Sequence, residues 1–189
     1  MQKYGGEPSI SFPTIFKVEN IVLSYNHKDY TLNEPINPTN KFIIKGNFSI
    51  QDDNIVAERM ILEVAHIKNM VFFVTCAPLF RIELTSEYKI VIKFYTNSSK
   101  YVSIVSQDAC ALNTEYEFEF YFDNESIKEE IRLWKNVGGK LEKLIDVEYN
   151  NTITVDDYET ITVGNSKDPN KIYRDISATF KYIEIQQES

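Results

Sequence analysis

The chain of 189 residues contains little glycine, proline or cysteine: six, six and two residues respectively. So few glycines and prolines exclude a low-complexity linker. Hydrophobic residues make up 43% of the chain, which is enough to fill the core of one domain and excludes disorder. The longest apolar stretch, MVFFV at residues 70–74, is far shorter than a membrane-spanning helix. We therefore expect one folded domain that is not inserted in a membrane.

Clusters of basic residues are also missing, and we expect no N-terminal leader. The net charge is −8, and the Lys and Arg residues are scattered singly, so nucleic acid is not an expected partner. The opening MQKYGGEPSISFP has no apolar core of the length that a signal peptide needs. A protein kept in a reducing compartment would hold Cys76 and Cys110 as thiols; the alternative is a disulfide between them.

Aromatic residues are abundant, with 12 Tyr and 12 Phe, and they alternate with acids over residues 115–122, EYEFEFYF. A strand places alternate side chains on opposite faces. One face then carries Tyr116, Phe118, Phe120 and Phe122. The other carries Glu115, Glu117 and Glu119. We expect the aromatic face to be core and the glutamate face to be solvated, rather than a catalytic row.

The same pattern recurs about every ten residues, with Gly, Asn and Asp at the turns, and predicts about a dozen strands. Residues 29–40, with two prolines, are expected to form a loop. Residues 55–67 are interpreted as a strand, with a short helix as the alternative. The predicted fold class is all-β: an antiparallel two-sheet jelly-roll sandwich spanning residues 15–189, preceded by an irregular arm over residues 1–14.

The last eighty residues resemble the closing half of laminin-G-like and concanavalin A-like domains. The resemblance lies in Leu112–Tyr116, in the hairpin LWKNVGGK at residues 133–140, in Val163-Gly164 and in the final strand Ile176–Ile185. It implies a fold used chiefly to recognise carbohydrates and proteins, and sometimes to cleave polysaccharides. Fold alone does not set function.

Rings that stack on sugars are the main candidate binding residues. The aromatic candidates are Trp134, Tyr173 and Tyr101, and Asn136 is a polar candidate near Trp134. A core position is the alternative for Trp134. Calcium is a second candidate ligand, at Asp52, Asp53, Asp156 and Asp157; no other cofactor is expected. FRIEL at residues 80–84 resembles the alginate-lyase strand pattern in Arg81 and Glu83, but Thr85 stands where that pattern has a second Arg. No hydrolase triad is present.

These features predict a non-enzymatic recognition or assembly module. An acidic β protein with an irregular arm is typical of a virion component, such as a phage tail, fibre or capsid-decoration protein. Ile10 and Phe12 would anchor the arm on a neighbouring subunit of an oligomer made in the host cytoplasm, and the sandwich would face a cell-surface glycan. The alternatives are a polysaccharide-active enzyme, and an assembly protein that binds no sugar.

Overall fold

The computed structural model describes residues 12–51, 57–69, 74–97, 100–153, 158–166 and 175–188. Regular structure in these ranges consists entirely of strands. They are β1 (Thr14–Asn26), β2 (Lys28–Ile36), β3 (Phe42–Ile50), β4 (Arg59–Asn69), β5 (Val74–Leu84), β6 (Ile90–Tyr95), β7 (Tyr101–Val105), β8 (Glu115–Asp123), β9 (Lys128–Val137), β10 (Lys140–Tyr149), β11 (Tyr158–Val163) and β12 (Ile176–Gln187). In this described part, no helix is long and apolar enough to cross a membrane.

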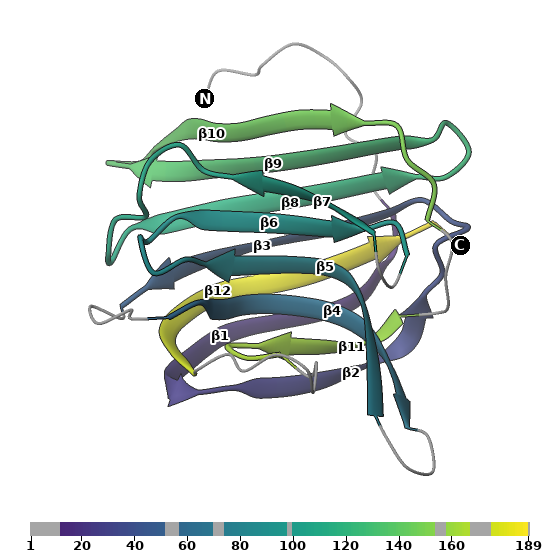
Figure 1. The fold of residues 1–189 in the computed structure, drawn as a ribbon, viewed down its shortest axis with the longest axis horizontal. Coiled ribbons are helices and arrows are strands. Elements are labelled where there is room, and N and C mark those ends of the chain that lie inside the picture. Colours follow the sequence, from purple (N-terminus) through teal and green to yellow (C-terminus); the bar gives the residue numbers. More distant parts are fainter. Residues whose placement is uncertain are drawn as a thin grey trace.

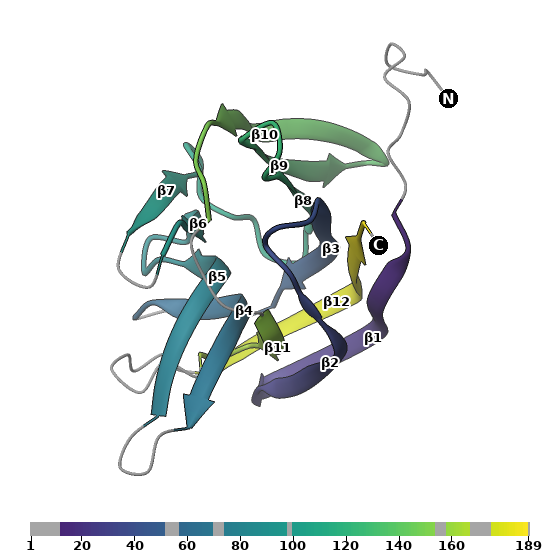
Figure 2. The same cartoon turned by 90° about the vertical axis from the view of Figure 1, so that its right-hand side faces the viewer.

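The strands form two six-stranded antiparallel sheets that pack face to face (Figures 1 and 2). Sheet A has the order β1-β12-β3-β8-β9-β10, and sheet B has the order β2-β11-β4-β5-β6-β7. Neighbours in each sheet are often distant in sequence, as when the last strand, β12, lies between β1 and β3. The predicted all-β jelly-roll sandwich is confirmed.

Two local predictions are decided by the strands. In the segment 55–67, residues 59–67 belong to β4, so the helical alternative is wrong for this part of the segment. The loop predicted over residues 29–40 is also wrong in its first part, because β2 runs to Ile36 and includes Pro35. Among the described strands, β2 lies at the edge of sheet B and pairs with β11 alone. An edge strand tolerates proline because one side of it needs no backbone N–H donor.

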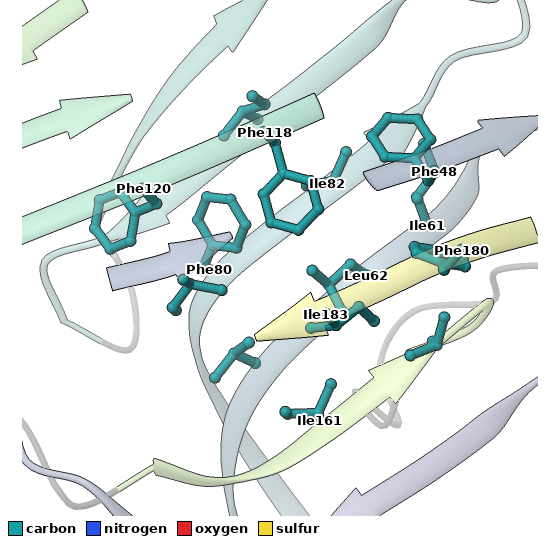
Figure 3. Packing of buried hydrophobic residues seen from close by; sticks show 14 of the residues in the cluster. Phe48, Ile61, Leu62, Phe80, Ile82, Phe118, Phe120, Ile161, Phe180 and Ile183 are labelled. Carbon is teal, nitrogen blue, oxygen red and sulfur yellow. The ribbon is translucent and has the colours of Figure 1, made fainter. Parts of the chain in front are cut away.

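The aromatic side chains of β8 fill the space between the sheets, as predicted. Tyr116, Phe118, Phe120 and Phe122 are all buried. Figure 3 shows Phe118 and Phe120 beside Phe80 of sheet B. The ring centroids of Phe80 and Phe120 lie 5.2 Å apart, and those of Phe94 and Phe120 lie 4.7 Å apart. These tilted and stacked contacts join the two sheets through β8.

Gly46 of β3 is required by this packing. A Cβ at this position would lie 2.8 Å from the ring of Phe118 and 2.8 Å from the backbone oxygen of Tyr182. We expect Gly46→Ala to lower the free energy of unfolding by about 1–3 kcal/mol, because the core has no room for the added methyl group. Urea denaturation checks this. A variant as stable as the wild type would show that the Phe118 ring moves aside at no cost.

Candidate functional site

The outer face of sheet A carries a continuous array of polar side chains. Glu115, Glu117 and Glu119 alternate with the buried aromatics of β8, so they point away from the core. Strand register and contacts place neighbours from β12, β3 and β9 beside them. We call this surface the glutamate face; it comprises Lys45, Asn47, Glu115, Glu117, Glu119, Arg132, Trp134, Asn136, Lys181, Tyr182 and Glu184.

One row of charges crosses all six strands of sheet A with alternating sign. In register order it consists of Lys17, Glu184, Lys45, Glu119, Arg132 and Asp146. Arg132 Nη1 lies 2.8 Å from Glu119 Oε1, and Arg132 Nε lies 3.6 Å from Asp146 Oδ1. Lys45 Nζ lies 3.7 Å from Glu184 Oε2. Opposite charges facing each other across strands stabilise a sheet, so this row neutralises itself.

Glu115 is also paired with a cation. The ammonium group of Lys181 contacts its carboxylate, and Asn136 Nδ2 lies 3.5 Å from its Oε1. Burial alone would raise the pKa of Glu115, but hydrogen bonds from Lys181 and Asn47 outweigh burial and lower it. Glu115 is therefore held in its ionised form.

Asn136 owes its place to the turn that follows it. Gly138 and Gly139 have positive φ values of 60° and 85° and form the two-residue hairpin between β9 and β10. Such hairpins need left-handed conformations at both central positions, which favours Gly-Gly. The backbone N–H of Gly139 donates to Asn136 Oδ1 at 2.9 Å. The Asn136 amide thus caps the turn with its oxygen and turns its nitrogen towards Glu115.

Glu117, at the centre of the glutamate face, differs from both neighbours. Within the described residues its carboxylate has no hydrogen bond or ion pair. Burial raises its pKa, the charge of Glu115 raises it further, and Lys181 offsets only part of the effect. Glu117 is thus a partly desolvated hydrogen-bond acceptor without a partner from the described part of the chain.

Two aromatic side chains accompany Glu117. Trp134 of β9 is directly opposite Glu117 and half-buried. Tyr182 lies in the same row, beyond Asn47, which is only 3% exposed. Burial raises the pKa of Tyr182, and the nearby carboxylates, Glu117 first among them, raise it further. The row Tyr182, Asn47, Glu117, Trp134 therefore places a carboxylate between two rings.

The outer face of sheet B holds a second polar group, but its charges are paired internally. Arg81 is 1% exposed, its Nη2 lies 2.6 Å from Glu63 Oε2, and its Nη1 donates to the Tyr95 hydroxyl at 2.9 Å. Lys93 likewise pairs with Glu83. Both cations of this group are already engaged by acids, so the FRIEL strand serves a buried ion-pair network.

The structure separates the predicted sugar-binding residues. Trp134 and Asn136 lie together on sheet A, and the core alternative for Trp134 is wrong because the ring lies on the outer face. Tyr101 is 52% exposed but lies on β7 of sheet B, with its ring 5.1 Å from that of Tyr95. Tyr173 lies outside the described residues.

The other predicted sites are described only in part. Ile10 and the calcium candidates Asp52, Asp53, Asp156 and Asp157 lie outside the described residues. Groups of three or more metal-ligating side chains are absent from the residues that the structure covers. Phe12 is half-buried, just before β1. No disulfide bond joins Cys76 to Cys110.

Sequence reasoning missed Tyr182 and Asn47, and interpreted Glu117 only as a solvated side chain. The alternation of residues 183–185 gives Tyr182 an outward phase, whereas alternation counted from Ile176 gives it an inward phase. A register shift between Phe180 and Tyr182 interrupts the pairing of β12 with β3. The sequence alone does not show that β12 and β3 bring these side chains to Glu117.

Comparison with known proteins supports the fold. No protein-family model matches the sequence, and no curated protein is similar to it. The structure is similar to the CBM40 domain of the Ruminococcus gnavus IT-sialidase bound to α2,3-sialyllactose, with a TM-score of 0.59, 11% identity and 92% of each chain covered.

Two enzymes are similar over less of their length. A Trypanosoma rangeli sialidase in complex with 2,3-difluorosialic acid has a TM-score of 0.52 and 9% identity, covering 77% of this chain and 20% of the sialidase. A family 7 alginate lyase, A1-II′, in complex with its substrate has a TM-score of 0.52 and 8% identity, covering 82% and 63%. At such identities the likeness shows the fold alone, a concanavalin-like jelly-roll sandwich.

Proposed function

We propose that this chain is a non-enzymatic carbohydrate-binding module that holds a saccharide on the glutamate face. The observation that carries the proposal is the row Tyr182, Asn47, Glu117, Trp134, in which an unpartnered carboxylate lies between two rings. Sugars offer an apolar C–H face to aromatic rings and hydroxyl donors to carboxylates. Glu117 would accept from a hydroxyl or an amine, and Trp134 would stack on the sugar ring.

Pre-organisation of this surface supports the proposal. Arg132, Lys45 and Lys181 hold the acids around Glu117 in place, and the Asn136 amide is fixed by the Gly138-Gly139 turn. A binding surface whose side chains are already ordered loses less entropy when a ligand arrives. The similar CBM40 domain was solved with a bound saccharide. It supports the proposal only at the level of the fold, because function does not follow from fold.

The test is binding of the whole chain to a panel of glycans, followed by calorimetry on the glycans that bind. Trp134 is the only tryptophan, so its fluorescence reports directly on the proposed site. We expect bound saccharide to change that fluorescence. We expect Trp134→Ala to weaken binding at least about tenfold, because a stacked aromatic dominates small polar sites.

Tyr101→Ala is the matched control. It removes an exposed aromatic side chain that was also predicted to bind sugar, but on the opposite sheet. Affinity should remain within about twofold of the wild type, since the two faces are separated by the core. Loss of binding in Tyr101→Ala, with Trp134→Ala unaffected, would move the site to sheet B.

A glycoside hydrolase on the same face is a second candidate, favoured by one observation. The pKa of Glu117 is raised while that of its strand neighbour Glu115 is lowered. Two nearby carboxylates with pKa values pushed apart match the acid and nucleophile of a glycosidase. Reducing-sugar release that disappears in Glu117→Gln would support this candidate against the non-enzymatic one.

A place in a virion, with docking through the N-terminal arm, stays a prediction from the sequence. If no glycan binds, the alternative of an assembly protein without sugar binding would replace the proposed function. In that case the charged row across sheet A would serve only to stabilise the sheet and keep its outer face soluble.

A further inference from the structure

The charges on the glutamate face are balanced except at its centre. Lys45 contacts Glu184, and Arg132 contacts Glu119. Farther out, Lys17 lies 2.6 Å from Glu19, and Lys143 contacts Asp146. At the centre, Glu115 and Glu117 share the single ammonium group of Lys181, which is bonded to Glu115. These three side chains have a net charge of −1, located at Glu117.

The two rings in the row of Glu117 favour a cation near its carboxylate. The faces of Trp and Tyr attract positive charge, and Trp does so most strongly. Trp134 is adjacent to Glu117 across β8 and β9, and the Tyr182 hydroxyl is close enough for the Glu117 charge to raise its pKa. An ammonium group at Glu117 would meet its carboxylate and the neighbouring ring of Trp134, with Tyr182 farther along the row beyond Asn47.

From this arrangement we infer that the saccharide bound on the glutamate face contains an unacetylated amino sugar whose ammonium group pairs with Glu117. This inference rests on the proposed function and specifies its ligand. An acidic sugar would instead bring a carboxylate against Glu115, Glu117 and Glu119, where the described cations of this face are already paired with acids. The specificity would thus be opposite to that of the similar CBM40 domain, whose ligand is sialyllactose.

Three oligosaccharides separate these possibilities: a glucosamine tetramer, the fully N-acetylated tetramer and α2,3-sialyllactose. Calorimetry with the whole chain should show the glucosamine tetramer binding about tenfold or more tightly than the acetylated one, and sialyllactose not binding. The advantage of the glucosamine tetramer should shrink in about 0.5 M salt, because added ions screen charge pairs.

Glu117→Gln keeps the shape of the side chain and removes its charge. The variant should bind the two tetramers equally, at the affinity that the wild type has for the acetylated one. Glu148→Gln, which removes an exposed acid on β10 of the same sheet, should keep the wild-type preference. This control shows whether the effect is local or only a change in net charge.

The outcomes distinguish the inference from the proposed function. Equal binding of both tetramers by the wild type, tighter binding of sialyllactose, or an unchanged preference in Glu117→Gln would overturn the inference. The proposed function would stand in each of these cases, provided that Trp134→Ala still weakened binding. Failure of the wild type to bind any saccharide, here and in the glycan panel, would overturn both.

Discussion

Replacing Phe120 with alanine should lower the free energy of unfolding by about 3–5 kcal/mol, because it leaves a cavity between the sheets. Phe120 is completely buried on β8, and its ring contacts aromatic side chains of both sheets. The centroid distances are 5.8 Å to Phe42 in sheet A, and 5.2 Å and 4.7 Å to Phe80 and Phe94 in sheet B. Loss of these contacts is expected to lower the urea midpoint and the melting temperature together.

Glu117→Gln is the matched control on the same strand. Its side chain points outward and keeps nearly the same volume, so the free energy of unfolding should change by less than about 0.5 kcal/mol. Urea denaturation of both variants provides the comparison. A large loss in Glu117→Gln with a small loss in Phe120→Ala would mean that the two faces of β8 are reversed.

The sequence predicted most of this fold because strand alternation is a local property. Residues 115–122 show by their period of two which side chains are buried, and the structure agrees for Phe118 and Phe120. The loop predicted at residues 29–40 failed for a non-local reason. Pro35 is tolerated only because β2 is an edge strand, and strand order depends on pairings between distant segments.

The candidate site was less predictable than the fold for the same reason. Trp134 and Asn136 could be selected as exposed polar or aromatic residues of a hairpin. Their relation to Glu117 depends on the register of β9 against β8, and the place of Tyr182 depends on β12 pairing with β3. These pairings bring together residues 47, 117, 134 and 182 from four separate strands.

A buried acid in the core was not anticipated from the sequence. Glu129 of β9 is 0% exposed and shares the inward phase of Ile131 and Leu133. Asn151 Nδ2 donates to its Oε2 at 3.2 Å, whereas its Oε1 is buried with no hydrogen-bond partner among the described residues. Burial raises the pKa of Glu129 to about 7, and the hydrogen bond from Asn151 offsets only part of the effect.

This pKa predicts that the fold loses stability as the pH rises. The folded state keeps the Glu129 proton up to about pH 7, whereas the unfolded chain releases it near its ordinary value of 4.5. The stabilising contribution is therefore complete below about pH 4.5 and is lost as the pH rises through 7, by about 3 kcal/mol in total.

Glu129→Gln has no proton to release at this position. Urea denaturation from pH 5 to 8 should show the variant gaining stability relative to the wild type, with the largest gain at pH 8. Glu142→Gln removes an exposed acid on β10, and its free energy of unfolding should change with pH in parallel with that of the wild type. Parallel curves for Glu129→Gln would mean instead that water reaches the Glu129 carboxylate and keeps it ionised in the fold.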